Sequence, residues 1–410
     1  MVYIKGEIMT DKKNILLVHN YYQLPGGEDT VVNNEKKMLE NHGYNVFLYT
    51  RDNKELQGIS LIGKISFAIN FLFNFRTFVE VRKIIKQCNI DLVHVHNTLS
   101  LVSPSVYYAA LSKKIPVVKT IHNFRLVCPN ALFYRDGNIC EDCITKGLHS
   151  AIKHKCYRNS RIQTIACVLN LKIHRFLGIY KKLNYICLTE FNRKKLLSVK
   201  GISPNNVYIK PNFTKANDRY MPLRERMKKF IYVGRIEKIK GIDILLNAWC
   251  QLEDKTIELL MYGTGPEQDW CEEFIKENHL NIKMMGYIDN DKIKDQLAES
   301  IALIFPSKLY EGFPMVITEA FSVGTPVIAS KIGNAKYIVD NGVNGILYET
   351  DNHMELANIV QYYGNIVTEE MCLAAKEKYK NCYSMESNYK ILNDIYNNVI
   401  RGNIINENSL

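Results

Sequence analysis

The sequence predicts an α/β protein made of two doubly wound parallel sheets that face each other across a cleft. Short β-branched and aromatic runs alternate with amphipathic helical stretches from one end of the chain to the other, which is typical of parallel sheets covered by helices on both faces. The alternation is interrupted once, between residues 205 and 224, where Pro211 and Pro222 lie in a segment of little periodicity. We expect this segment to link the two sheets.

The predicted strands form two series along the chain. The first series is Ile15–His19, Val46–Tyr49, Leu92–His96, Val117–Ile121 and Tyr185–Leu188. The second series is Phe230–Val233, Glu258–Tyr262, Lys283–Tyr287, Ala302–Phe305, Val327–Ala329 and Gly345–Leu347. We therefore expect one domain over residues 1–203, a second over 204–384, and a final helix with a frayed polar tail over 385–410.

Composition is that of a globular protein, with 410 residues of which 47% are hydrophobic and 23% charged. A chain of this length supports two separate cores. No apolar run is long enough to span a membrane, and the first residues lack a secretory leader, so a cytoplasmic location is expected. The apolar stretch 59–75 is broken by Lys64, Asn70 and Asn74. It is either a buried helix and loop or a segment that dips into lipid headgroups.

The net charge of +11 is concentrated in one region. No acidic residue occurs between Asp142 and Glu190. The bases in this stretch are Lys146, Lys153, Lys155, Arg158, Arg161, Lys172, Arg175, Lys181 and Lys182. Apolar residues at roughly helical spacing are interleaved with them, namely Ile162, Ile165, Val168, Leu169, Ile173, Phe176 and Leu177. This pattern favours contact with an anionic membrane surface, and the alternative is a solvated basic face. No nucleic-acid-binding motif accompanies it.

Glycines and cations follow several predicted strands, where ligands bind in open parallel sheets. Gly26 and Gly27 open a helix after the first strand, so their backbone could approach an anion or could simply form a turn. Arg235 and Lys240 lie five residues apart in a strand-to-helix loop. Two such cations can hold a diphosphate from two sides, or they are a solvated basic loop. Gly263 follows the next strand.

Two glutamates lie eight positions apart after a later strand of the second series. Glu311 falls in the loop and Glu319 about one turn inside the next helix. We expect both carboxylates to point toward one pocket, where sugar hydroxyls could donate to them. Backbone amides near Phe313 and Met315 should face the same space.

These motifs together resemble glycosyltransferase family four, the retaining enzymes with the two-domain GT-B fold. The resemblance is carried by Gly234-Arg235 with Lys240-Gly241, by Glu311-Gly312-Phe313-Pro314 with Glu319, by His122-Asn123, and by Leu188-Thr189-Glu190-Phe191. It extends over nearly the whole chain. The resemblance implies an N-terminal acceptor-binding domain, a C-terminal nucleotide-sugar-binding domain and a last helix that crosses back to the first domain.

The resemblance also implies roles for individual residues. Arg235 and Lys240 would contact the donor diphosphate, Glu319 the ribose, and Glu311 the donor sugar, with His122 beside the transferred sugar. The expected catalytic set is His122, Glu311, Arg235 and Lys240. The expected donor-binding set adds Gly26, Gly27, Gly263, Gly312, Phe313, Pro314, Met315 and Glu319.

The implied reaction is transfer from a UDP- or GDP-sugar to a lipid-linked or oligosaccharide acceptor at the inner face of the cell membrane. Relatives that this resemblance suggests build capsule or other surface polysaccharides. The alternatives are a catalytically silent scaffold of a polysaccharide-assembly complex and a sugar-nucleotide epimerase. No cofactor is expected to be required for catalysis.

Two sequence features suggest metal binding. Asp289-Asn290-Asp291 has the Asp-x-Asp pattern of metal-dependent transferases of another fold, but its position before a helix favours an N-cap. Four of the eleven cysteines, Cys128, Cys140, Cys143 and Cys156, surround a turn and include a Cys-x2-Cys pair. They either bind a structural zinc or are reduced cysteines packed in a loop.

Overall fold

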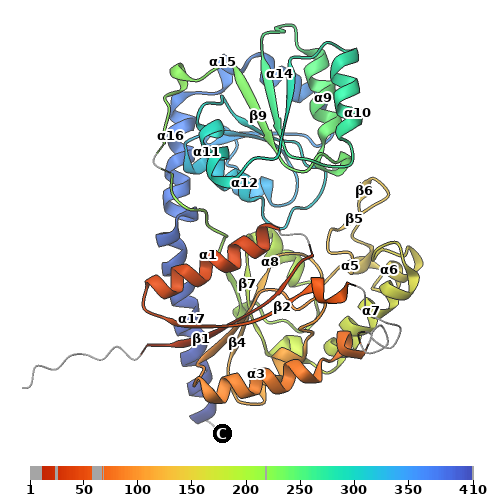
Figure 1. Cartoon of the computed structure of the whole chain (residues 1–410), viewed down its shortest axis with the longest axis vertical. Coiled ribbons are helices and arrows are strands. Elements are labelled where there is room, and N and C mark those ends of the chain that lie inside the picture. The colour runs from red at the N-terminus through yellow and green to blue at the C-terminus, as the bar shows by residue number, and fades with distance from the viewer. Residues whose placement is uncertain (1–11, 24–25, 58–66, 68, 218, 409–410) are drawn as a thin grey trace, which may run out of the picture.

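The structure is a computed structural model that describes residues 12–23, 26–57, 67, 69–217 and 219–408, with the side chains of 290–291 and 403–408 excepted. Two α/β domains lie one above the other, and a long C-terminal helix runs along both (Figure 1). Each domain contains a six-stranded sheet in which every strand pairing is parallel. The predicted fold class is therefore confirmed.

The first sheet has the strand order β2-β1-β3-β4-β7-β8. Its strands are β1 (Asn14–Tyr21), β2 (Asn45–Asp52), β3 (Leu92–Val95), β4 (Val117–Ile121), β7 (Asn184–Cys187) and β8 (Val207–Ile209). The helices of this domain are α1 (Gly27–Asn41), α3 (Phe75–Gln87), α4 (Ser105–Leu111), α5 (Asp142–Thr145), α6 (His149–Lys153), α7 (Arg161–Phe176) and α8 (Glu190–Leu196). A short hairpin of β5 (Tyr134–Arg135) and β6 (Asn138–Ile139) stands apart.

The second sheet has the order β11-β10-β9-β12-β13-β14. Its strands are β9 (Lys229–Val233), β10 (Glu258–Tyr262), β11 (Ile282–Gly286), β12 (Leu303–Phe305), β13 (Val327–Ser330) and β14 (Gly345–Tyr348). Its helices are α9 (Ile242–Gln251), α10 (Gln268–Glu277), α11 (Asn290–Ala298), α12 (Met315–Ser322), α13 (Ala335–Ile338), α14 (His353–Gln361), α15 (Tyr363–Ile366) and α16 (Glu369–Lys378).

The strand order determines where each sheet has a crevice that can bind a ligand. In the first sheet the chain reverses direction across the sheet between β1 and β3, and in the second between β9 and β12. The loops after these strands diverge to opposite faces, which leaves a crevice at the carboxyl edge of each sheet.

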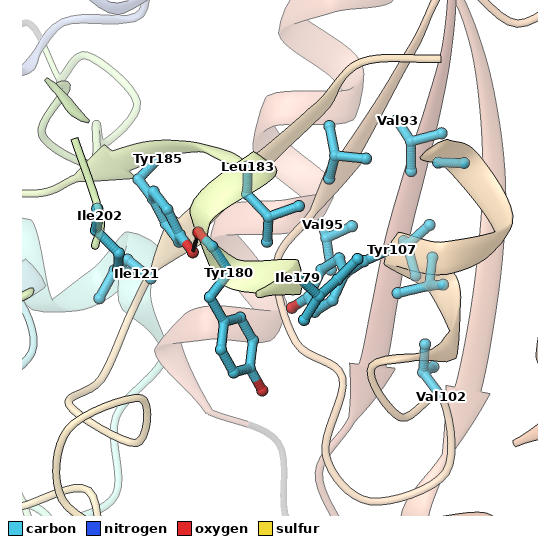
Figure 2. Close-up of a cluster of buried hydrophobic side chains, with 14 of the residues drawn as sticks. Val93, Val95, Val102, Tyr107, Ile121, Ile179, Tyr180, Leu183, Tyr185 and Ile202 are labelled. Atoms are coloured by element: carbon cyan, nitrogen blue, oxygen red, sulfur yellow. Dashed lines mark hydrogen bonds between the residues drawn. The ribbon is translucent and has the colours of Figure 1, made fainter. Parts of the chain in front are cut away.

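The core of the first domain is formed by side chains on β3, β4 and β7 and by the segments that cover them (Figure 2). Tyr185 is fully buried, and its hydroxyl donates to the carbonyl of Tyr180 at 2.7 Å. This bond matters because a buried phenol without a partner would destabilise the core.

Two predictions about the chain's organisation need correction, and a third falls largely outside the described residues. Residues 207–209 form β8, which pairs with β7, so the first sheet extends into the predicted linker. Three residues between proline-containing turns are too few to show a strand period. The polar tail is helical to Asn408 within α17 (Met385–Asn408). Residues 58–66 and 68 of the apolar stretch lie outside the described residues.

The last helix crosses back onto the first domain, as the resemblance implied (Figure 1). Leu392, Ile395, Tyr396 and Val399 of α17 pack with Ile15 and Leu17 of β1 in one buried cluster. The helix thus completes the hydrophobic core of the first domain after the chain has built the second.

Candidate active site

A cavity of about 340 Å³ lies beside the loops that follow β9 and β12. One wall comes from the first domain, because Gly27 at the start of α1 contributes to it. The cavity is lined by Gly27, Tyr232, Val233, Gly234, Arg235, Lys240, Phe305, Pro306, Ser307, Glu311, Phe313, Pro314, Met315 and Val316. Its position matches the crevice that the strand order predicts.

Lys240 and Glu311 meet in this cavity as an ion pair. The Lys240 Nζ lies 2.6 Å from the Glu311 Oε1, and the side chains are 21% and 17% exposed. The Ser307 hydroxyl donates to the same carboxylate oxygen at 2.9 Å. Arg235 also lines the cavity, but it is 70% exposed and pairs with Glu237 at 2.9 Å. The two predicted cations therefore share one cavity, with Lys240 in the drier position.

Glycine at position 241 allows this arrangement. Its φ is +78°, and a Cβ there would lie 1.9 Å from the carbonyl oxygen of Pro306. The loop that carries Lys240 can therefore approach the loop that carries Glu311 only with glycine at this position.

Glu319 does not line the cavity, contrary to the expectation that both carboxylates point into one pocket. It lies one turn further along α12 than Met315, which does line it, and is 9% exposed. Burial raises the pKa of Glu319 to about 7, against a smaller lowering effect of the Lys294 charge. Carboxyls whose pKa is raised by burial are concentrated at functional sites.

The two predicted glycine sites differ from expectation in detail. Gly27 lines the cavity, whereas the backbone N–H of Gly26 donates to Asp29 Oδ2 at 3.0 Å and so is already occupied. Gly263 has a φ of +136°, and a Cβ there would lie 1.8 Å from the Gly234 carbonyl oxygen. Gly263 therefore supports the loop before Arg235 and is not among the residues that line the cavity.

His122 follows β4 in the first domain and lies against the loop of the second domain that carries Glu311. A Cβ at Gly312 would lie only 2.1 Å from the His122 carbonyl oxygen. His122 lines a separate small cavity of about 60 Å³ together with His96, Lys119 and Arg125. The structure thus brings His122 and the Glu311–Gly312 loop together across the domain boundary.

The side chains of Asn334, Asn192 and Thr189 hold this contact through hydrogen bonds. The Asn334 amide donates to the carbonyl oxygens of Glu311 and Gly312 at 2.6 and 2.5 Å. The Asn192 amide donates to the Gly312 oxygen at 3.2 Å, and the Thr189 hydroxyl donates to Asn334 Oδ1. Thr189 lies in the segment that carried the family resemblance, but nothing in the sequence marks Asn334, which is 145 residues away from it.

Comparison with known proteins identifies both domains. A family model described as "Glycosyltransferase Family 4" matches residues 25–217, and one described as "Glycosyl transferases group 1" matches residues 214–371. The chain is a family-four glycosyltransferase.

Individual relatives of this glycosyltransferase are distant. An uncharacterised protein in the cps region of Klebsiella pneumoniae is 26% identical over 73% of this chain and 74% of its own length. The amylovoran biosynthesis glycosyltransferase AmsD of Erwinia amylovora is 25% identical over 77% and 81%. An uncharacterised glycosyltransferase of Methanocaldococcus jannaschii is 23% identical, with 62% of this chain matched to 61% of its length.

A solved structure shows the same fold. Anabaena HepE in complex with UDP aligns over 93% of this glycosyltransferase and 98% of its own chain, with a TM-score of 0.64 and 18% identity. The GT-B fold implied by the sequence is therefore confirmed.

Among the described residues, Glu35, His94 and His96 are the one set of three potential metal ligands whose ligand atoms all lie within 4.8 Å of one another. The set is fully buried, and Lys210 Nζ lies 2.9 Å from Glu35 Oε2. A lysine cation already neutralises the carboxylate, so this set does not fit a resident metal. Asp289 occupies the N-cap position of α11 as predicted, but its side chain makes no capping hydrogen bond.

Replacing Glu319 by glutamine should remove a pH dependence of stability. A carboxyl whose folded pKa is raised above its unfolded value gives stability that is fully present below the unfolded pKa and is lost as pH rises through about 7. The shift corresponds to about 3 kcal/mol as an order of magnitude. In denaturant unfolding, Glu319→Gln should match the wild type near pH 4 and exceed it at pH 8. A difference that does not vary with pH would contradict this assignment.

Proposed function

We propose that this glycosyltransferase transfers a sugar from a UDP- or GDP-sugar to a lipid-linked saccharide, with retention of configuration, during surface polysaccharide synthesis. The observation that carries the proposal is the cavity between the domains, in which Lys240, Arg235 and Glu311 lie beside the contact with His122. The cps-region and amylovoran relatives support the polysaccharide assignment, and HepE binds UDP.

The geometry supports catalysis by charge stabilisation. As the bond between the sugar and the diphosphate stretches, negative charge builds on the leaving phosphate. Lys240 can then exchange its pairing with Glu311 for the phosphate oxygens, and the amides at the start of α12 can donate to the same charge. The released Glu311 carboxylate is free to accept hydrogen bonds from sugar hydroxyls. The acceptor oxygen then bonds to the sugar's anomeric carbon on the face that the phosphate leaves, and the leaving phosphate takes the acceptor proton, so that configuration is retained.

The proposal is tested with a panel of nucleotide sugars. The correct donor should raise the melting temperature, and the rise should grow with the logarithm of its concentration over Kd, because the donor binds only the folded state. It should then yield a saccharide product only when acceptor is present, and activity should not need an added divalent metal. Product formation without acceptor would instead indicate an epimerase.

Membrane association is the second part of the proposal. Exposed apolar and basic side chains lie together on α7 and its flanks, where Ile162 is 82% and Phe176 91% exposed. Lys153, Lys155, Arg158 and Arg161 are also exposed. Two members of the predicted surface face inward instead, since Val168 is buried and Arg175 donates to the Leu126 carbonyl. In the part of the chain that the structure describes, no helix has the length and apolar character needed to span a membrane.

We predict that the protein floats with vesicles containing anionic lipid and is released as salt rises. Each base near an anionic surface contributes on the order of 1 kcal/mol, and salt screens this attraction. Changing Lys153, Lys155, Arg158 and Arg161 to serine should abolish flotation. A matched control changes four exposed bases of the second domain, namely Arg224, Lys228, Lys255 and Lys276. If both variants float equally, the basic stretch is a face exposed to water and does not contact the membrane.

A further inference from the structure

A row of buried polar side chains connects α1 to His122. Glu35 is 1% exposed, and its Oε1 lies 3.1 Å from His94 Nδ1 and 3.3 Å from His96 Nε2. The other nitrogen of His96, Nδ1, lies 2.9 Å from His122 Nε2. The row therefore runs from Glu35 through both nitrogens of His96 to His122.

The charge state of each member is set by its surroundings. Burial alone would raise the pKa of Glu35, but the Lys210 charge and the contacts of His94 and His96 outweigh it and hold that pKa well below its usual range. Burial lowers the pKa of His96 to about 3 and, with the charges of His96 and Lys119, lowers the pKa of His122 well below its usual value. At neutral pH the charged Glu35 carboxylate thus faces a neutral His96 imidazole, which in turn contacts a neutral His122 imidazole, and each of these two rings has one N–H.

The negative charge of Glu35 determines which ring nitrogen of His96, and then of His122, carries the hydrogen. His96 Nε2 and Glu35 Oε1 are not aligned as a full hydrogen bond, and His96 Nε2 has no other partner among the described residues, whereas Glu35 Oε1 also lies near His94 Nδ1. If His96 Nε2 lacked hydrogen, its lone pair would face a buried negative charge, so the hydrogen belongs on Nε2. His96 Nδ1 is then an acceptor and must take the hydrogen of His122 Nε2.

We propose that Glu35 and His96 are positioning residues that hold His122 with its hydrogen on Nε2, so that His122 Nδ1 is an acceptor for a hydroxyl of the bound sugar or acceptor. The inference rests on the proposed function of His122. His122 Nδ1 is suited to this task because it has no hydrogen-bond partner among the described residues, and His122 lines a cavity.

The test compares variants that change the proton position without leaving a buried charge. Glu35→Gln together with Lys210→Met removes both charges of the pair, and the glutamine amide no longer requires hydrogen on His96 Nε2. His96→Asn can still accept from His122 Nε2 through its side-chain oxygen, whereas His96→Leu cannot. Tyr396→Phe is the structural control, because it removes the 2.7 Å contact to His94 but leaves the row to His122 intact.

We expect kcat to fall at least tenfold in Glu35→Gln/Lys210→Met and in His96→Leu, with donor KM little changed, and to be largely restored in His96→Asn. Long-range ¹H–¹⁵N spectra of histidine-labelled protein should show His122 protonated on Nε2 in the wild type, in Tyr396→Phe and in His96→Asn, but not in Glu35→Gln/Lys210→Met or in His96→Leu. Wild-type kcat and spectrum in the double variant would overturn the proposal. High activity of His122→Ala would instead overturn the proposed role of His122.

The cysteine loop carries a second, independent inference. Cys128 follows β4, Cys140 ends the β5–β6 hairpin, Cys143 lies in α5 and Cys156 follows α6. These segments come together in the fold, because the Cys128 and Cys143 thiols are close enough to interact, and Cys143 and Cys156 pack on the same apolar cluster. The Cys140 N–H donates to the Phe133 carbonyl at 2.8 Å, which fixes the base of the hairpin.

Hydrogen bonds and a cation surround these sulfurs. The Cys128 thiol donates to Asn130 Oδ1 at 3.0 Å, and the Asn130 amide donates to the Tyr134 carbonyl at 2.9 Å. Arg135 lies close enough to Cys156 to interact with it, and its positive charge would offset part of the negative charge that four thiolates give a bound metal. The four sulfurs do not lie within 4.8 Å of one another in the described structure, so binding must draw them inward.

We propose that Cys128, Cys140, Cys143 and Cys156 bind one structural zinc ion, which prefers four thiolates in a tetrahedron. Elemental analysis of protein purified without chelator should find about one zinc per chain, and Cys140→Ser and Cys143→Ser should lose it. Cys250→Ser, outside the loop, should retain it. No zinc in fresh protein and no uptake from added zinc chloride, or full zinc in Cys140→Ser, would overturn the proposal.

Discussion

Replacing Lys240 by alanine should lower kcat about a hundredfold, the usual loss when one electrostatic donor is removed from a dry site. The Lys240 side chain is only 21% exposed, so in its absence water can supply only part of the stabilisation that its charge gives to the leaving phosphate. Arg235→Ala should lose less, because its side chain is 70% exposed and acts through solvent. The measurement is kcat at saturating donor and acceptor, with circular dichroism and thermal unfolding to verify the fold.

The matched control for this prediction is Lys308→Ala. Lys308 lies in the same loop as Glu311 and also forms a partly buried ion pair, with Asp243 at 2.6 Å, but it does not line the cavity. Its loss should therefore affect stability more than turnover. If Lys240→Ala keeps most of its activity, or if Lys308→Ala loses as much, the cavity is not the site where charge develops.

The fold could be predicted because the spacing of apolar residues along the sequence differs between strands and helices. Buried parallel strands are continuous apolar runs, and each of the eleven predicted segments overlaps a strand of the two sheets. The strand β8 was not predicted, because Val207–Ile209 is too short to show the two-residue period of a strand. Only its pairing with Tyr185–Cys187 makes it a strand.

Those residues of the candidate site that lie in loops directly after strands could be predicted from the sequence. Loops at the carboxyl edge of a parallel sheet converge, so Arg235, Lys240 and Glu311 could be assigned to one cleft from their positions after strands, whereas His122 was assigned to the site through the family resemblance. Glu319 was misplaced because spacing along a helix does not say which face is covered. The partners Asn334, Asn192 and Glu35 were not found, because their contacts join segments far apart in the chain.

Replacing Gly312 by alanine should lower kcat about a hundredfold while the chain still folds. The added Cβ would lie 2.1 Å from the His122 carbonyl oxygen, and neither backbone can give way as a flexible side chain could. The loop must therefore move away from His122 by about an ångström, which is enough to cost roughly two orders of magnitude in a site that depends on orientation.

The control for this substitution is Gly364→Ala, at a helical glycine where a Cβ would meet no atom within 4 Å. Both variants should have far-ultraviolet circular dichroism like that of the wild type, and Gly364→Ala should also keep its kcat. Gly312→Ala should still bind free nucleotide, because Arg235, Lys240 and the start of α12 all belong to the second domain. Unchanged turnover in Gly312→Ala would mean that the contact between His122 and the Glu311–Gly312 loop is not kept during the reaction, and that transfer proceeds with the domains further apart.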